Sequence, residues 1–566
     1  QWGFNGVIMS DWGSTHHCVP AVKGGLDLEM AGGEKMNPKD LAYYLKTGVI
    51  SMDMIDEKVR HILRVLIAFG FKDGTKVDNS IPLDDPESVA TALKVAQEGI
   101  VLLKNEKNVL PINPKSTKHI VVVGKNANGY VRGGGSGNVT PFHYVGAFDG
   151  IREVGESYGV KVEYVDEMDF MPEIMYTNEK LQEKGLHAEY FTNQHLEGKP
   201  LLERTEQKVN YSWSGGTSIE GMSKEHYSVR WSGIVRPAET AEYEFLAGGD
   251  DGYRMYINDE LVADEWKVGG FRTSTIARTL QAGVNYRIRF EYFQEGGGAA
   301  ASFTWKRKNE TRDLFIEHLN KADMIVACFG HSSDSEAEGG DRSFFLPEAD
   351  SQLITRIAKC KKPIIGVVNA GGNIGMQSWE PSLKGLLWGW YAGQEGGHAI
   401  ADVLFGKVNP SGKLPMTFEK KWEDNPAYNS YHDPDGDKHV KYTEGIYIGY
   451  RGYDKLGRDV QYPFGYGLSY TSFKLSDMVA SAPNADGSVK VTNTGKRDGA
   501  QVIQAYVGRD KSGIVDRPEK ELKKFEKVFL KTGETKTVTM TLPKDAFTYY
   551  STIDKQFVTD PGIYNI

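Results

Sequence analysis

GFNGVIMSDWG, at residues 3–13, is an apolar run that ends in a carboxylate, an indole and a glycine. Its apolar part, from Phe4 to Met9, predicts a buried strand, and Asp11 is then expected at the carboxyl end of that strand. In α/β folds, this end of a strand is where catalytic groups lie. Asp11 could also make a turn or cap a following helix, and the residues around it do not decide between these roles.

The residues after this stretch predict the order strand, loop, strand, helix. A second short strand is expected at 25–30, and apolar residues on one face predict a helix over 55–67 that stops at Gly70. A closed (β/α)8 barrel needs roughly 250 residues, but the composition already changes near Pro82. We therefore expect residues 1–85 to form the end of a (β/α)8-type barrel, in a fragment that lacks most of the N-terminal barrel.

Helix and strand patterns alternate over 86–183 and again over 310–470. In residues 184–309, apolar residues instead recur with a period of two, which predicts an antiparallel β module. Because domain termini commonly lie close together, we expect one α/β sandwich domain interrupted by an inserted antiparallel β-sandwich. Residues 471–566 predict a C-terminal immunoglobulin-like β-sandwich. The elements expected in the α/β domain are a helix over Val89–Leu103, strands at Ile120–Gly124, Val160–Val165, Met324–Gly330, Ile364–Asn369 and Leu386–Trp390, a helix from Pro347 and a helix over Gly396–Phe405.

Bulk composition excludes some classes of function. The formal net charge of -9 leaves no basic footprint for nucleic acid or for an anionic membrane. No stretch approaches the roughly 18 uninterrupted apolar residues of a membrane span. The cysteines, Cys18, Cys328 and Cys360, suggest neither a disulfide framework nor a zinc site. The sequence does not determine the localisation, although a periplasmic or secreted protein is favoured over a cytoplasmic one.

A second candidate region is the acidic loop DSEAEGGDR at 334–342, which directly follows a buried-strand run. Four acids in eight residues repel one another, and crowded like charges raise the pKa of at least one of them, as a general acid near neutral pH requires. A solvated loop without a catalytic role is the alternative. Asp341 and Arg342 predict a structural or sugar-binding pair. The glycine-rich loop at 133–137 lacks the Lys-Ser/Thr ending of a phosphate loop, so nucleotide binding is not expected there.

Four motifs follow one another along the chain: VIMSDWG at 7–13, SEAEGGDR at 335–342, WYAGQEGGHAIADVLFGKVNPSGKLPMTF at 390–418 and YPFGYGLSYTSF at 462–473. Together they resemble glycoside hydrolase family 3, and its β-glucosidase branch in particular. GGDDGYRMYI at 248–257 resembles part of the protective-antigen β-sandwich domain that some members carry as an insertion. The tail resembles the fibronectin type III-like domain that closes the longer members.

The resemblance implies a role for five residues. Asp11 corresponds to the nucleophile, and Glu338, rather than Glu336, corresponds to the acid/base. Trp12 is expected to form a wall of the sugar pocket, and Asp341 and Arg342 to bind substrate. Retaining glycosidases need two carboxyl groups roughly 5 to 5.5 Å apart, so we expect a site between the barrel part and the α/β sandwich. Two carboxylates and a water suffice for this chemistry, so neither a cofactor nor a metal is expected.

The resemblance therefore implies a retaining exo-β-glucosidase that removes terminal β-D-glucose from short β-linked oligosaccharides or aryl glucosides. A β-xylosidase, an arabinosidase or a phosphorolytic relative of the same family is the alternative within enzymes, and a carbohydrate-binding protein without activity is the alternative outside them. A homo-oligomer is compatible with the sequence. Because most barrel strands are expected to be absent, the fragment alone is expected to have little or no activity.

Overall fold

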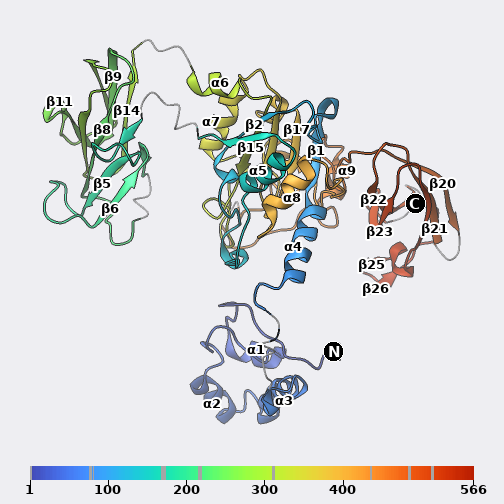
Figure 1. Cartoon of the computed structure of the whole chain (residues 1–566). Coiled ribbons are helices and arrows are strands. Elements are labelled where there is room, and N and C mark those ends of the chain that lie inside the picture. Colours follow the sequence, from blue (N-terminus) through green and yellow to red (C-terminus); the bar gives the residue numbers. More distant parts are fainter. Residues whose placement is uncertain are drawn as a thin grey trace. The chain divides into compact units, whose positions relative to one another are not determined.

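The computed structural model describes residues 3–74, 80, 82–166, 174–213, 219–308, 313–433, 436–481, 486–510 and 515–566 (Figure 1). The chain divides into two compact units, Gln1–Asp85 and Pro86–Ile566, and each is described by itself. The helical elements of the first unit are α1 (Cys18–Gly24), α2 (Pro38–Lys46), α3 (Met52–Ala68) and the short 3-10 helix η1 (Phe71–Asp73).

In the first unit, α3 confirms the helix that the apolar periodicity predicted. It ends at Ala68, and Gly70 follows in the left-handed conformation with a φ of 75°. The fully buried apolar residues are few: Cys18, Val22 and Ile50 form the centre of the core among the described residues of this unit. Several apolar side chains on α3 remain exposed, including Leu63 and Ile67.

The two strands predicted at 4–9 and 25–30 are not formed. Only an isolated parallel bridge joins Met9 and Leu28, and the side chains of Phe4 and Met9 are 63% and 58% exposed. A strand needs hydrogen-bonding neighbours along its length, and among the described residues of this unit each of the two segments has only the other. The prediction of buried strands was therefore wrong for this unit, and the barrel remains a prediction.

A six-stranded sheet forms the centre of the second unit, with the order β1-β17-β16-β15-β2-β3. Five neighbouring strands, from β17 to β3, run parallel, and β1 pairs antiparallel with β17 at the edge. The strands are β1 (Val101–Asn105), β2 (His119–Val123), β3 (Lys161–Tyr164), β15 (Met324–Gly330), β16 (Ile364–Asn369) and β17 (Gly385–Trp388). The buried runs predicted near these positions are therefore strands of one sheet.

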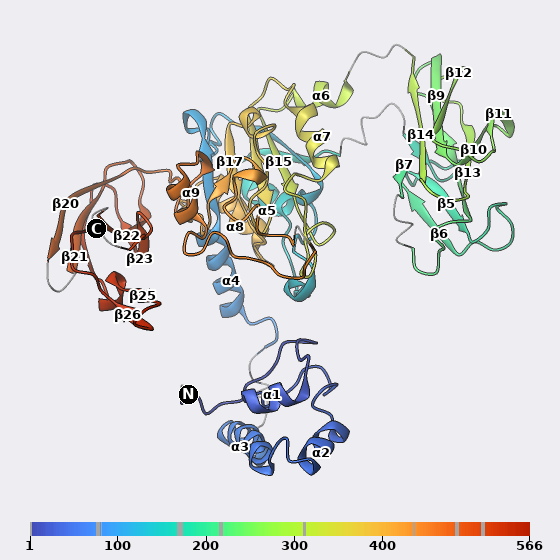
Figure 2. The ribbon, with the colours of Figure 1, turned by 180° about the vertical axis from the view of Figure 1, so that it is seen from behind.

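Helices cover both faces of this sheet (Figures 1 and 2). The helices α4 (Pro86–Gly99), α5 (Ala147–Ser157) and α8 (Gly396–Leu404) contribute buried residues to the core on one face. On the other face, α6 (Leu314–Leu319) and α7 (Glu348–Ile357) pack against the sheet. Because both faces are covered, the central strands are continuous apolar runs rather than alternating ones.

The helix predicted over Val89–Leu103 is shorter than expected. α4 ends at Gly99, and Val101–Asn105 is the edge strand β1, whose first three residues are almost completely buried. Periodicity alone could not separate the two elements, because a short apolar run suits a buried strand as well as a buried helix segment.

The region between β3 and α6 forms two antiparallel sheets, whose strands Figure 2 shows from behind, and their buried side chains form one core. One sheet has the order β11-β10-β13-β8-β5-β6, with β4 paired to β8, and the other has the order β12-β9-β14-β7. Since β4 precedes residue 184, the predicted boundary falls after the first strand of this sheet. The strands are β4 (Met175–Tyr176), β5 (Leu186–Phe191), β6 (Leu202–Glu206), β7 (Val209–Ser212), β8 (Tyr227–Val235), β9 (Ala241–Asp250), β10 (Gly252–Ile257), β11 (Glu260–Glu265), β12 (Arg272–Leu280), β13 (Tyr286–Gln294) and β14 (Ala300–Arg307).

The chain after α8 contains a small two-stranded sheet, the helix α9 (Tyr450–Leu456) and a β-rich tail. In the tail, the orders β20-β21-β24 and β23-β22-β27 define two three-stranded sheets, and a core centred on Val491 and Leu530 joins strands of both. No helix among the described residues is long and apolar enough to cross a membrane. The strands are β18 (Phe418–Glu419), β19 (Val460–Tyr462), β20 (Phe473–Ser481), β21 (Asp486–Asn493), β22 (Gly499–Arg509), β23 (Glu521–Leu530), β24 (Thr535–Thr541), β25 (Tyr549–Ser551), β26 (Gln556–Val558) and β27 (Tyr564–Asn565).

Candidate active site

The carboxyl ends of β2, β15, β16 and β17 lie at one edge of the parallel sheet. From β2 the chain moves outward to β3, whereas from β15 it moves in the other direction through β16 to β17. The strand order therefore reverses between β2 and β15. In open α/β sheets, ligands bind outside the carboxyl ends of the strands at such a point. The acidic loop follows β15, and the glycine-rich loop follows β2.

The end of β15 is held by buried polar groups. Asp350, at the start of α7, accepts a hydrogen bond from the N–H of Gly330 at 3.0 Å, and burial raises the pKa of this carboxyl group. The backbone N–H of His331 donates to the carbonyl oxygen of Asn369 at 2.8 Å, and its ring Nδ1 lies 2.9 Å from the hydroxyl of Ser335. The acidic loop therefore begins from a fixed point on the sheet.

Glu336 is bound by Arg342 of its own loop and by groups from two other loops. It accepts hydrogen bonds from the backbone N–H of Gly371 at 3.0 Å and from the hydroxyl of Tyr391 at 3.0 Å. Its Oε2 also lies 3.2 Å from Nε of Arg342 in an ion pair that is about four-fifths buried on both sides. Gly371 follows β16 and Tyr391 follows β17. Glu336 thus ties the acidic loop to the neighbouring strands, which is a structural role.

Glu338 is exposed, and its contacts differ from those of Glu336. Its Oε2 accepts hydrogen bonds from the hydroxyl of Ser136 and, at 2.8 Å, from the backbone N–H of Ser136. The Ser136 hydroxyl, followed by the Ser136 N–H, lowers the pKa of Glu338. For Glu338 this is opposite to the raised pKa that crowding of acids predicted. The reason is that two donors stabilise the ionised carboxylate, while repulsion between exposed charges is screened by water.

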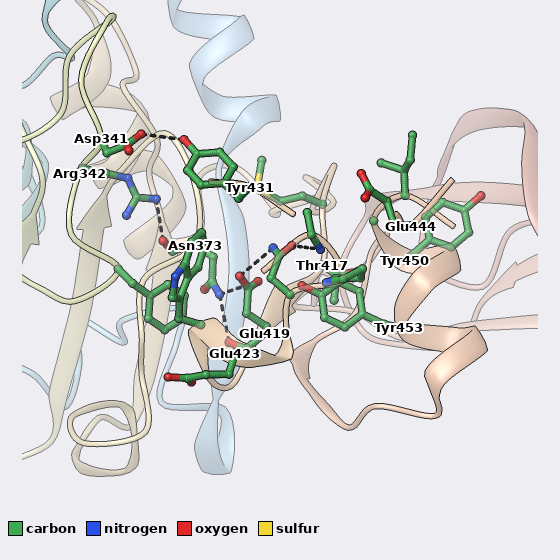
Figure 3. A pocket seen from close by; sticks show the side chains of 18 of the residues that line it. Asp341, Arg342, Asn373, Thr417, Glu419, Glu423, Tyr431, Glu444, Tyr450 and Tyr453 are labelled. Atoms are coloured by element: carbon green, nitrogen blue, oxygen red, sulfur yellow. Dashed lines mark hydrogen bonds between the residues drawn. The ribbon is translucent and has the colours of Figure 1, made fainter. Parts of the chain in front are cut away.

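Asp341 and Arg342 do not pair with each other. The hydroxyl of Tyr431 donates to Oδ1 of Asp341 at 2.7 Å, whereas Arg342 pairs with Glu336 and donates from Nη2 to the carbonyl oxygen of Asn373 at 2.6 Å. Both residues line a cavity of about 1030 Å³, which Figure 3 shows from close by. Their sugar-binding role stays a prediction.

The other side of this cavity is formed by the chain between Pro415 and Phe464, of which residues 434 and 435 lie outside the described residues. Glu419 is buried and accepts two hydrogen bonds from Nδ2 of Asn373, each at 3.0 Å, as drawn in Figure 3. The aromatic residues that line the cavity are Phe344, Phe345, Trp422, Tyr431, Tyr450, Tyr453 and Phe464.

Asp11 and Trp12 lie in the first unit, while Glu338, Asp341 and Arg342 lie in the second. Oδ1 of Asp11 accepts a hydrogen bond from the N–H of Trp12 at 2.7 Å, and its carbonyl oxygen accepts one from the hydroxyl of Ser14. Asp11 is exposed, and Trp12 is 72% exposed. Both side chains are thus accessible in their own unit.

Sequence reasoning missed Ser136, Gly371 and Tyr391 as partners of the acidic loop, and Asp350 as the partner of Gly330. The sequence contained a signal for Ser136, because the glycine-rich loop follows a predicted strand just as the acidic loop does. Such loops meet when their strands are neighbours in a parallel sheet, but strand order cannot be read from one sequence. Among the described residues, no group of three or more His, Cys, Asp or Glu side chains is arranged to hold a metal ion.

Two family models match parts of the second unit. The model of the glycosyl hydrolase family 3 C-terminal domain matches residues 100–450. The chain belongs to glycosyl hydrolase family 3. The model of the fibronectin type III-like domain matches residues 501–566, so the α/β domain and the fibronectin type III-like tail that the resemblance implied are confirmed. The family 3 chain is therefore a glycoside hydrolase, and the protective-antigen-like nature of its two-sheet module remains a prediction.

Relatives of this family 3 chain carry β-glucosidase names. Probable β-glucosidase I of Aspergillus clavatus is 31% identical over 610 residues, which span 100% of this chain and 72% of the relative. Probable β-glucosidase K of Emericella nidulans is 33% identical over 582 residues, which span 97% of this chain and 68% of the relative. The crystal structure of the β-glucosidase from Kluyveromyces marxianus in complex with glucose has a TM-score of 0.68 at 30% identity and covers 100% of this chain and 71% of that one.

Proposed function

We propose that this family 3 hydrolase is a retaining exo-β-glucosidase that removes terminal β-D-glucose from short oligosaccharides or aryl glucosides. The observation that carries the proposal is the placement of Glu338. It lies on the loop after β15, beside the point where the strand order reverses, and its carboxylate is exposed. The β-glucosidase names of relatives that span the whole chain support the choice of sugar.

The contacts of the acidic loop favour Glu338 over Glu336 as the acid/base. Glu336 is engaged by Arg342, Tyr391 and the backbone of Gly371, so it has no free oxygen for a substrate. Oε1 of Glu338, in contrast, accepts no hydrogen bond from any residue within the described ranges. A general acid must reach the proton acceptor directly, and only Glu338 is accessible for this.

In the proposed mechanism, Asp11 attacks the anomeric carbon while Glu338 protonates the oxygen of the leaving group. A water molecule, activated by the ionised Glu338, then hydrolyses the glycosyl-enzyme on Asp11. Trp12 supplies an apolar face for the sugar ring, and Asp341 and Arg342 contribute to sugar binding from the second unit. Asp11 is proposed as the nucleophile on the strength of the SDW motif.

Trapping the covalent intermediate tests the nucleophile. A 2-deoxy-2-fluoro-β-glucoside with a good leaving group should label the protein, and peptide mapping should place the label on Asp11. A label on another residue, or no label in a protein that turns over p-nitrophenyl β-glucoside, contradicts the assignment. A faster reaction with p-nitrophenyl β-xyloside than with the glucoside would instead support the xylosidase alternative.

Two matched substitutions on the acidic loop test the acid/base. We expect Glu338→Gln to lower kcat/KM for p-nitrophenyl β-glucoside by roughly 10² to 10⁴. Substrates with a leaving group that needs no protonation, such as 2,4-dinitrophenyl glucoside, should lose much less in the first step, and azide should restore turnover. Glu336→Gln serves as the control, because it removes a charge from the same loop without this dependence on the leaving group.

A further inference from the structure

The glycine-rich loop at 133–137 is shaped against the loop that carries Glu338. Gly135 has a φ of +69°, and a Cβ at this position would lie 2.4 Å from Cβ of Glu338. A Cβ at Gly134 would lie 2.8 Å from Cβ of Ala337. Since real side chains cannot approach this closely, glycine at 134 and 135 is what allows the two loops to touch.

This contact makes the two oxygens of the Glu338 carboxylate unequal. The backbone N–H and the hydroxyl of Ser136 both donate to Oε2. Oε1 is free of hydrogen bonds from the part of the chain that the structure describes. The contact joins the loop after β2 to the loop after β15, where the strand order reverses. One oxygen is therefore held by the protein, and the other is available to a ligand.

We propose that Ser136 is a positioning residue, which holds Oε2 of Glu338 so that Oε1 is the oxygen that exchanges the catalytic proton. This inference rests on the proposed role of Glu338 as the acid/base. In the first step, the proton on Oε1 moves to the glycosidic oxygen, the bond between that oxygen and the anomeric carbon breaks, and Asp11 bonds to the carbon. In the second step, water bonds to the carbon, the bond to Asp11 breaks, and the proton lost by water goes to Oε1.

The same contact affects the balance between the two steps. Because the Ser136 donors lower the pKa of Glu338, they favour the ionised form that acts as the base in the second step. Two other acids of the same loop, Glu336 and Asp341, accept hydrogen bonds from the hydroxyl groups of Tyr391 and Tyr431 respectively. Removal of the Ser136 hydroxyl should therefore raise the pKa of Glu338.

The principal experiment compares Ser136→Ala and Ser136→Thr with the wild-type protein over a range of pH. For Ser136→Ala we expect kcat/KM on p-nitrophenyl β-glucoside to fall by about tenfold, as for the loss of one hydrogen bond to a charged group. The alkaline limb of the pH profile should move to higher pH, because this limb reports the ionisation of the acid. Ser136→Thr retains the hydroxyl and should restore both. A wild-type profile in Ser136→Ala overturns the proposal.

Two glycines of the same turn provide a matched pair. Gly135→Ala introduces a clash with Glu338 and should lower kcat/KM by about a hundredfold through misplacement of the carboxylate. Gly137→Ala should have little effect, because a Cβ there meets no atom within 4 Å. Equal losses in the two variants would show a general sensitivity of the turn and would contradict the proposal.

A titration without substrate separates this inference from the proposed function. The ¹³C signal of the Glu338 carboxyl group, assigned by its loss in Glu338→Gln, should titrate at a higher pH in Ser136→Ala than in the wild-type protein. An unchanged midpoint overturns the positioning role. A raised midpoint in a protein that hydrolyses no glucoside would keep the contact of Ser136 with Glu338 but reject the acid/base role, and with it the positioning role.

Discussion

The segment around Asp11 and the loop that carries Glu338 are held in different ways. Near Asp11, the chain is fixed by backbone hydrogen bonds between the segments at 8–10 and 27–28, such as Ser10 N–H to Leu28 O at 3.0 Å. Its apolar side chains, including Met9 and Trp12, remain exposed. The loop of Glu338 instead starts from a fully buried strand and is joined by side-chain contacts to the loops after β2, β16 and β17 and to Tyr431.

The two candidate catalytic groups therefore differ in what makes each of them rigid. A carboxylate on a loop between packed parallel strands is positioned by a large core, and its neighbours can be changed one at a time. A carboxylate on a segment with few buried contacts depends on a small number of polar contacts, above all those of Asp27. Four predictions test this difference, from the largest expected effect to the smallest.

Phe329→Ala should destabilise the α/β domain most. Phe329 is fully buried in β15, and its ring packs edge-on against that of Trp379, with 5.3 Å between the ring centroids. The substitution therefore leaves a large cavity. We expect a loss of about 4 kcal/mol of stability. Hydrogen exchange measured by mass spectrometry should show faster exchange in peptides that contain β15, with no change over residues 3–30. A similar acceleration in both regions would contradict the separate origin of their rigidity.

Asp27→Ala should have the corresponding effect in the first unit. The buried carboxylate of Asp27 accepts a hydrogen bond from the N–H of Ile8 at 2.9 Å and lies 3.1 Å from Nδ1 of His61. Its removal leaves both groups without this partner, at a cost of about 2 to 3 kcal/mol. Exchange over residues 3–30 should accelerate, while β15 stays protected. Asp27→Asn keeps an acceptor for Ile8 and should show a smaller change.

Glu336→Gln should cost stability, whereas Glu338→Gln should not. The first substitution weakens a partly buried ion pair with Arg342 and the bonds from Gly371 and Tyr391, and we expect a loss of about 1 to 2 kcal/mol. Glu338 is exposed, and within the described ranges its carboxylate accepts hydrogen bonds from Ser136 alone, so its substitution should leave the unfolding midpoint in urea near that of the wild-type protein. Equal shifts in the two variants would contradict the structural role of Glu336.

The smallest expected effect is the dependence of stability on pH. Glu395 is buried at the start of α8. Its Oε2 lies 2.6 Å from Nδ1 of His398, and its Oε1 lies 2.6 Å from Nε2 of His143, which is on the segment that follows the glycine-rich loop. Burial lowers the pKa of His398, but its hydrogen bonds with Glu395 and Glu153 outweigh this and raise it. A raised pKa in the folded state means that the stabilisation is complete below the unfolded value of about 6.5 and is lost as the pH rises through the folded value.

His398→Gln should therefore lower the melting temperature at pH 5.5 and have less effect at pH 8.5. The expected cost at the lower pH is below about 1 kcal/mol, because the pair is partly exposed to water. Burial raises the pKa of Glu395, but its hydrogen bonds with both histidines lower it overall, so the partner is ionised at pH 5.5. A difference between variant and wild type that does not depend on pH would contradict this linkage.

The strands of the α/β domain could be predicted well because they are buried on both faces. Met324–Gly330 and Ile364–Asn369 are continuous apolar runs, and the structure gives both as strands with the predicted bounds. The end of the helix before Val101 could not be predicted, because a helical pattern there continued directly into the edge strand. The strands expected before Asp11 and at 25–30 failed for a different reason, since pairing depends on neighbours that a local pattern does not contain.

By itself, the sequence determined the candidates: acids after apolar runs, glycines in a loop after a strand, and motifs in the order of one family. It could not distinguish Glu336 from Glu338 by contacts, because the two residues share one loop and one charge. Only the tertiary structure decided that Glu336 is bonded to loops after β16 and β17, whereas Glu338 meets Ser136 from the loop after β2. The physical reason is strand order, which brings distant loops to one edge of the sheet.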